Sequence, residues 1–130
     1  LFLERVPELY VAMFGALKRG AVVGPLFSAF GPEAIQDRLA DAEACVVVTS
    51  PALKSRLDAI RGELPALRRV VVLNRKREPL DLAAYETDFD TLMQASPDFE
   101  VPYTEPDQYS IMHYTSGTTG NPKGALHAHR

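Results

Sequence analysis

The chain has 130 residues, a formal net charge of −3 and a single cysteine, and 46% of its residues are hydrophobic. This apolar content is enough for a packed core, and the acidic balance argues against a general nucleic-acid binder, which is usually basic. One cysteine excludes an internal disulfide, no apolar run is long enough to span a bilayer, and no signal-peptide pattern opens the sequence. We therefore expect a cytoplasmic protein that binds neither nucleic acid nor membrane.

The first long element after a short strand-like opening is predicted to be a helix over residues 7–19. Apolar residues recur there at four-residue spacing, at Leu9, Met13 and Leu17. A proline at the first helical position and Gly20 after the last turn are typical helix boundaries.

Residues 21–27, AVVGPLF, predict a short buried strand that a Gly-Pro pair interrupts. The aromatic residues Phe27 and Phe30 are interpreted as packing residues beneath a loop. A place in an acyl pocket is the alternative for this aromatic pair.

Two further helices are predicted. One covers residues 32–44, with Ile35, Leu39 and Ala42 facing inward. The other begins after a Ser-Pro cap and carries a clean apolar stripe, formed by Leu53, Leu57, Ile60 and Leu64.

A fully apolar run comes after each of these two helices, CVVVTS at residues 45–50 after the first and VVVL at residues 70–73 after the second. Such runs are typical of strands inside parallel sheets, and we interpret Cys45 as an inert core thiol. Strand and helix thus alternate with short links. This order predicts parallel strands with right-handed crossovers in an α/β architecture.

The next part of the chain is strongly charged. Residues 74–81 are interpreted as a solvated loop, with a phosphate or nucleic-acid patch as the alternative. The acidic run at residues 85–96 predicts a short helix. Its carboxylates at Glu86, Asp88 and Asp90 could hold a metal only if the segment were extended.

The segment YTSGTTGNPKG, residues 114–124, concentrates small and polar residues after an apolar strand-like run. Its glycines permit backbone angles that let successive N–H groups converge on one point, and its serine and threonine hydroxyls can donate to oxygen atoms. Lys123 adds a positive charge on a flexible stem. Together these groups describe an anion cradle, and the anion we expect is a phosphate chain. An ordinary solvated loop is the alternative.

The nucleotide-binding motif G-x-x-x-x-G-K-[ST] does not fit this segment. Gly117 and Lys123 have the right separation, but Pro122 stands before the lysine and Gly124 comes after it. The hydroxyl that would bind magnesium in that motif is therefore missing.

Three histidines flank the segment, His113 before it and His127 and His129 after it. In an extended strand His127 and His129 would share one face, which could form a metal pair. Because two ligands are too few for a zinc site, we interpret the histidines as polar residues that line or support a nucleotide cleft.

Residues 114–124 resemble, without a gap, the phosphate-binding loop of the AMP-forming adenylating enzymes, a superfamily that includes acyl-CoA synthetases, luciferases and adenylation domains of peptide synthetases. Residues 5–50 are similar to the corresponding region of acetyl-CoA synthetases of the shorter bacterial type. The resemblance is weakest over residues 74–106. It implies an α/β fold of alternating strands and helices, in which residues 1–130 are part of the large N-terminal AMP-binding (adenylation) domain, truncated at both ends.

The resemblance also implies an activity, that of an AMP-forming acid–thiol ligase. Such enzymes bind ATP and Mg²⁺, a substrate carboxylate attacks the α-phosphorus, pyrophosphate leaves, and coenzyme A then displaces AMP from the acyl-adenylate. Acetate or another short-chain acid is the expected substrate. The alternatives are a medium-chain acid, an amino acid, or a phosphate-binding module without catalysis.

Residues that match the family's loop inherit the role of holding the ATP phosphates: Thr115, Ser116, Gly117, Thr118, Thr119, Gly120 and Lys123. Lys123 would also stabilise the charge on the departing phosphates. No nucleophile is assigned, because the substrate carboxylate is itself the nucleophile, and no metal ligand is assigned within these residues. The family's adenine, ribose, magnesium and coenzyme A residues lie further along, so the 130 residues alone are expected to be inactive.

Overall fold

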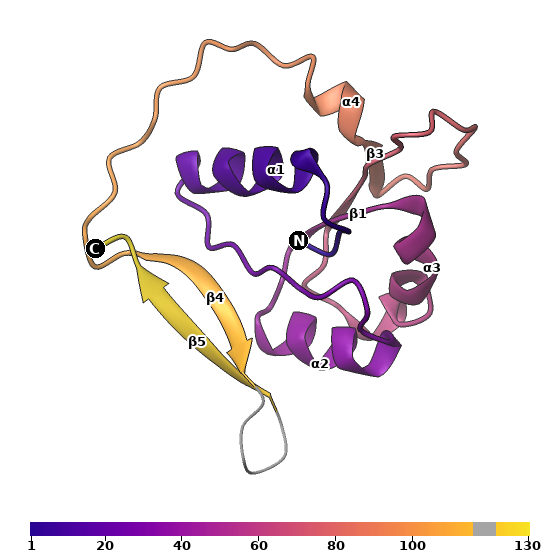
Figure 1. Cartoon of the computed structure of the whole chain (residues 1–130), viewed down its shortest axis with the longest axis horizontal. Helices are drawn as coiled ribbons and strands as arrows, with labels where there is room; N and C mark the ends of the chain where they lie inside the picture. The colour runs from indigo at the N-terminus through magenta and orange to yellow at the C-terminus, as the bar shows by residue number, and fades with distance from the viewer. Residues whose placement is uncertain (116–121) are drawn as a thin grey trace.

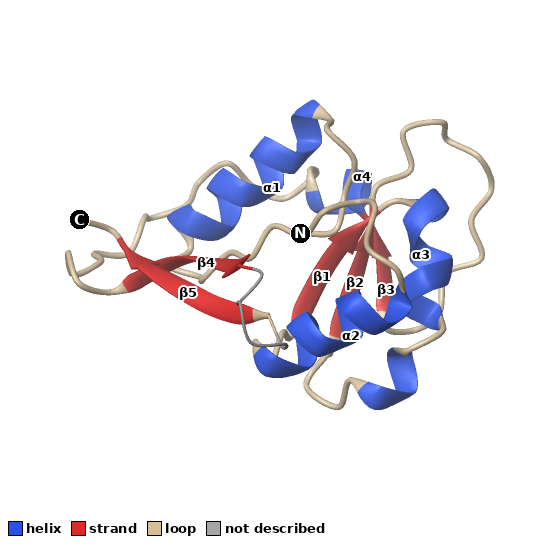
Figure 2. Ribbon diagram, turned by 60° about the horizontal axis from the view of Figure 1, so that its bottom comes forward, coloured by secondary structure: helices blue, strands red, loops and turns tan. Residues whose placement is uncertain are grey.

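The computed structural model describes residues 1–115 and 122–130. Its central feature is a three-stranded parallel sheet in the order β1 (Val46–Thr49), β2 (Arg69–Val72) and β3 (Glu86–Asp88). The two apolar runs therefore form parallel neighbours, as the sequence predicts. Figure 2 shows the three strands side by side, with helices on either side of them.

Three longer helices surround this sheet, and each begins at a proline. They are α1 (Pro7–Lys18), α2 (Pro32–Asp41) and α3 (Pro51–Asp58). A short 3₁₀ helix, η1 (Arg61–Glu63), comes after α3, and a single turn, α4 (Phe89–Leu92), comes after β3. A proline at the first helical position suits a helix start, because the N–H that it lacks has no partner inside the helix. None of the helices described here is long and apolar enough to cross a bilayer.

The core has two layers, one on each face of the sheet, and successive side chains of β2 pack in different layers because they alternate between the faces of a strand. Val70 and Val72 pack in one cluster with residues of α2 and α3. Val71 packs in a second cluster on the opposite face with Phe89 of α4, and Leu9 of α1 lies against it. Helices thus cover both faces of the sheet, which confirms the predicted α/β architecture.

The apolar stripes of the helices are confirmed to different degrees. Leu53, Leu57, Ile60 and Leu64 are all buried, although α3 ends at Asp58 and the last two residues flank η1. In α2 the inward residues Ile35 and Leu39 are buried. No residue of α1 is fully buried, and Leu9 is the residue of its predicted stripe that packs against the second cluster.

The last two strands form a separate antiparallel hairpin, β4 (Tyr109–Thr115) and β5 (Lys123–Ala128), which Figure 1 shows beside α2 and the N-terminal half of the chain. Val23 fixes this hairpin to the segment after α1. Its N–H donates to the Ser110 carbonyl at 2.8 Å, and its own carbonyl accepts from Met112 N–H at 2.9 Å. The sequence did not lead us to expect this hairpin.

Three expectations about apolar residues are wrong. Cys45 is exposed rather than a core thiol, because it lies before β1 at the end of the sheet. Of the two aromatic residues expected to pack beneath a loop, Phe30 does pack against the main core cluster, but Phe27 is 71% exposed and lies edge-on to the Phe30 ring. Residues 21–27 form isolated bridges at Val23 and Leu26 rather than a buried strand, since only these two of its large side chains are buried.

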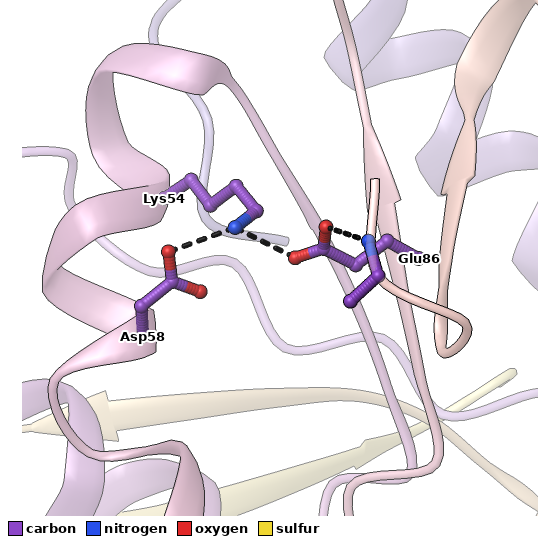
Figure 3. A network of polar contacts seen from close by, with 4 residues as sticks. Lys54, Asp58 and Glu86 are labelled. Atoms are coloured by element: carbon purple, nitrogen blue, oxygen red, sulfur yellow. Dashed lines mark hydrogen bonds and ion pairs between the residues drawn. The ribbon is translucent and has the colours of Figure 1, made fainter. Parts of the chain in front are cut away.

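The acidic run after β2 is extended at β3, but its buried carboxylate, that of Glu86, forms a salt bridge. Glu86 has a side chain that is 1% exposed, and its Oε1 lies 2.7 Å from Lys54 Nζ (Figure 3). Its Oε2 accepts a hydrogen bond from the N–H of Ala83 at 2.9 Å. Asp88 instead caps α4 by accepting from Asp90 N–H. Glu86, Asp88 and Asp90 therefore do not form the metal clamp that an extended segment could have offered.

Candidate functional site

The hairpin presents the two ends of the candidate phosphate loop opposite each other. Thr115 is the last residue of β4, Lys123 is the first of β5, and the two are direct partners in the strand register. Both are exposed. The other five predicted site residues lie outside the described part of the chain: Ser116, Gly117, Thr118, Thr119 and Gly120.

Thr115 and Lys123 share one face of the hairpin, because directly paired residues project to the same side of a sheet. The same alternation places His113 and His127 on that face, and both are exposed. A hydroxyl, an ammonium group and two imidazoles thus gather on one solvent-facing surface. This surface can offer hydrogen bonds and one positive charge to an anion.

The histidine pair differs from the one that the sequence suggested. His113 and His127 lie across the two strands, with ring centroids 5.8 Å apart in an edge-to-face arrangement. His129 lies beyond the end of β5, so it does not share an extended strand with His127. Within residues 1–115 and 122–130, no three His, Cys, Asp or Glu side chains are grouped as metal ligands.

Gly124 leaves room for the ring of Tyr114 on the neighbouring strand. It is the direct partner of Tyr114, and a Cβ at Gly124 would lie 3.3 Å from Cε1 of the Tyr114 ring. Among the described residues, Gly20 is the glycine with a positive φ. The expectation that Gly124 supplies a special backbone angle is therefore wrong, and what distinguishes the position is the close approach of an aromatic ring, which would have to shift to accept a side chain.

Sequence reasoning missed the partner of Tyr114. Its hydroxyl donates to Asp41 Oδ2 at 2.7 Å, at the last residue of α2. Burial and this hydrogen bond raise the pKa of the Tyr114 phenol above its ordinary range. Nothing local in the sequence connects two residues 73 positions apart. The one available signal for this contact was Tyr114 itself, a large aromatic residue at the start of a segment of otherwise small and polar residues.

A cavity of about 540 Å³ lies elsewhere, at the carboxyl ends of β1 and β2. Its lining includes Glu4, Ser50, Leu73 and Arg75, and none of the predicted site residues. Open α/β sheets commonly bind ligands at this end of their strands. Here the Ser50 hydroxyl donates to Glu4 Oε1 at 2.9 Å, so the polar groups at this position satisfy each other.

Comparisons with known proteins find relatives that match nearly the whole chain. The chain is 41% identical over 130 residues to an acetyl-coenzyme A synthetase of Bacillus subtilis and 37% identical over 144 residues to one of Methanothrix thermoacetophila. Each match covers 99% of this chain, but only 22% and 21% of the respective relative. The chain thus spans about a fifth of the length of the curated relatives it matches.

Solved structures show the same fold. A crystal structure of a Brucella canis acyl-CoA synthetase superposes with a TM-score of 0.83 at 34% identity, covering 98% of this chain and 22% of that one. The anthranilate CoA ligase AuaEII in complex with anthranoyl-AMP also superposes with a TM-score of 0.83, at 28% identity and with 94% and 23% covered. The family model described as AMP-binding enzyme matches residues 1–130. The chain therefore belongs to the AMP-binding enzyme family.

Proposed function

We propose that this chain is part of the N-terminal adenylation domain of a cytoplasmic, AMP-forming carboxylate–CoA ligase, and that its hairpin holds the phosphates of ATP. The observation that carries the proposal is the end of the hairpin. There the hydroxyl of Thr115 and the ammonium group of Lys123 project from one exposed face, on paired residues at the two ends of the loop. The acetyl-coenzyme A synthetases among its relatives support a short aliphatic acid as the substrate.

In this reaction the substrate carboxylate attacks the α-phosphorus of ATP, and pyrophosphate leaves from an acyl-adenylate. The thiol of coenzyme A then attacks the acyl carbon and releases AMP. The hairpin's part is electrostatic, because negative charge builds on the departing phosphates and fixed donors around them stabilise it. Lys123 provides the positive charge, and Thr115 with the loop hydroxyls and amides provides hydrogen bonds.

Magnesium, which accompanies ATP in the reaction that the resemblance implies, would need oxygen ligands. The part of the chain that the structure describes gathers no three carboxylates or histidines for it. Glu86, the buried carboxylate on β3, is already paired with Lys54. The described residues therefore do not fit a magnesium site of their own.

A different carboxylic acid is the second candidate for the substrate. The reason is that a CoA ligase named for anthranilate, an aromatic acid, superposes as well as the Brucella acyl-CoA synthetase does. The experiment that separates these candidates measures acid-dependent pyrophosphate release by the intact protein with acetate, propionate, octanoate, anthranilate and an amino acid. Highest efficiency with acetate or propionate would support our proposal. ATP binding without pyrophosphate release from any acid would indicate a non-catalytic phosphate-binding module.

The glycines of the loop provide a prediction about how the loop meets its ligand. We expect Gly117→Val and Gly120→Val to lower the efficiency of ATP use more than Ser116→Ala does. A β-branched residue both disfavours positive φ and crowds an approaching phosphate, whereas water can partly replace one hydroxyl among several. The measurement is kcat/KM for ATP in the adenylation reaction. Equal and mild effects of all three substitutions would mean that the loop does not wrap its ligand.

A further inference from the structure

We propose that Tyr114 and Asp41 are positioning residues, which set the place of the ATP-phosphate hairpin by joining the end of β4 to the last residue of α2. This inference rests on the proposed function of the hairpin. The contact is a hydrogen bond from the Tyr114 hydroxyl to Asp41 Oδ2, 2.7 Å long. A hydrogen bond to an ionised carboxylate is about twice as strong as one between neutral groups.

The hydrogen bond between Tyr114 and Asp41 meets the hairpin one residue away from the candidate site. Tyr114 immediately precedes Thr115, and its direct partner Gly124 comes immediately after Lys123. Because side chains alternate along a strand, the Tyr114 ring lies on the face opposite the Thr115 and Lys123 side chains. The tyrosine therefore reaches α2 from one face and leaves the other free for the phosphates.

Both strands contribute to this contact. The absence of a side chain at Gly124 lets the Tyr114 ring lie close to the β5 backbone, since a Cβ there would be 3.3 Å from Cε1. The ring is half-buried, and its hydroxyl also lies 3.1 Å from the carbonyl oxygen of Arg38, one turn before Asp41. The phenol thus fits between β5 and the last turn of α2.

The end of α2 that carries Asp41 is held in place by contacts of its own. The Arg38 guanidinium carbon lies 4.3 Å from the centroid of the Phe30 ring and 5.8 Å from that of Tyr114, and its Nη1 donates to the carbonyl oxygen of Ala34. Phe30 in turn packs against the main core cluster. Arg56 of α3 holds the same segment by donating to the carbonyl of Phe30 at 3.1 Å. A hairpin tied to Asp41 is therefore tied to the packed core.

This placement has a consequence for the reaction. Donors stabilise departing phosphates only when they stand at hydrogen-bond distance from the developing charge, and a displacement of about 1 Å can cost as much as a hundredfold in rate. Among the described residues, backbone hydrogen bonds join the hairpin to the segment after α1 through Val23, near the far end of β4. The side-chain contact of Tyr114 lies next to Thr115 and Lys123 instead.

The experiment compares matched variants of the intact protein. Tyr114→Phe removes only the hydroxyl, Asp41→Ala removes its acceptor, and Asp41→Asn keeps an acceptor oxygen. Tyr109→Phe on the same strand and Asp37→Ala one turn earlier on α2 are the controls. The structure gives their side chains no hydrogen bond within the described residues, and both are exposed. The measurements are kcat and KM for ATP and for the acid, the equilibrium Kd of ATP, and the Tm of each variant.

We expect Tyr114→Phe and Asp41→Ala each to lower kcat/KM for ATP by about tenfold, because the donors at the end of the hairpin then stand away from the departing phosphates. The KM of the acid should stay within about twofold of the unmodified protein, and the double variant should be no worse than the poorer single variant. Asp41→Asn should fall between Asp41→Ala and the unmodified protein, because it keeps an acceptor oxygen but not the charge. Gly124→Ala, which forces the ring to move, should change kcat/KM for ATP in the same direction.

A fall in Tm without any change in kcat, in KM for ATP or in the Kd of ATP would overturn the proposal, because the contact would then be structural only. Equal effects of the test variants and the controls would overturn it as well. Failure of the proposed function has a different signature, namely that the unmodified protein releases no pyrophosphate with any acid. In that case the Kd of ATP still decides between a positioning role and none.

Discussion

Replacement of Lys123 by alanine is expected to lower the efficiency of acid adenylation by roughly tenfold to a hundredfold, which corresponds to about 1.5–3 kcal/mol of lost transition-state stabilisation. Lys123 is exposed at the first position of β5, opposite Thr115, so its loss removes a charge from the candidate site without leaving a hole in the core. The measurement is kcat/KM for ATP in acetate-dependent pyrophosphate release by the intact protein.

A half-reaction distinguishes the phosphate role of Lys123 from a general loss of function. Acetyl-adenylate supplied ready-made carries no β- or γ-phosphate, so its conversion to the thioester should proceed at a near-normal rate in Lys123→Ala. Lys76→Ala is a suitable control, because Lys76 is also exposed but lies in the loop after β2. If the thioester step fell as far as adenylation, the phosphate role of Lys123 would be wrong.

Much of the fold could be predicted because its signals are local. A proline start and a four-residue apolar period predicted the first helix over residues 7–19, and α1 runs from Pro7 to Lys18. The apolar run at residues 70–73 predicted a strand buried on both faces, and β2 is the central strand with Val70, Val71 and Val72 all buried. These patterns depend on neighbours in the sequence, so one chain is enough to read them.

Burial at the ends of elements was harder to predict, because hydrophobicity alone does not say what covers a residue. Cys45 and Phe27 look like core residues by type, yet both are exposed. The apolar run at residues 45–50 forms an edge strand, and Val46 at its start is 51% exposed. Position at the edge of the sheet explains the exposure of Cys45 and Val46, and that position depends on strand order, which local patterns do not show. Phe27 lies outside the sheet, in the segment before α2.

The sequence predicted which residues form the candidate site, but not how they are arranged in space. Hydroxyls, glycines and Lys123 indicated a phosphate loop, but the pairing of Thr115 with Lys123 depends on a hairpin that we did not predict. A turn-rich segment between two short strand-like runs was an available signal for it. The contact between Tyr114 and Asp41 had no such signal, because it joins β4 to α2 across most of the chain.

Replacement of Lys54 by methionine is expected to lower the free energy of unfolding by about 3 kcal/mol or more, because it leaves the charge of Glu86 buried and unpaired. Lys54 Nζ lies 2.8 Å from Asp58 Oδ2 and 2.7 Å from Glu86 Oε1 (Figure 3). Burial alone would lower the pKa of Lys54, but the hydrogen bonds to Asp58 and Glu86 outweigh it and raise the pKa to about 12. Urea unfolding of the intact protein at neutral pH measures the loss.

The two carboxylates beside Lys54 provide the matched control, because they differ in burial. Asp58 is 43% exposed and Glu86 is 1% exposed, so Asp58→Ala should cost no more than about 1 kcal/mol. Lys54→Met combined with Glu86→Leu should recover most of the stability, since no buried charge then remains. The pKa of Lys54 in the folded protein lies above its ordinary value of 10.5, so the ion pair stabilises the fold fully below that pH and is lost as the pH rises through about 12. A loss in Lys54→Met no larger than that in Asp58→Ala would show that Lys54 is not what compensates the buried carboxylate.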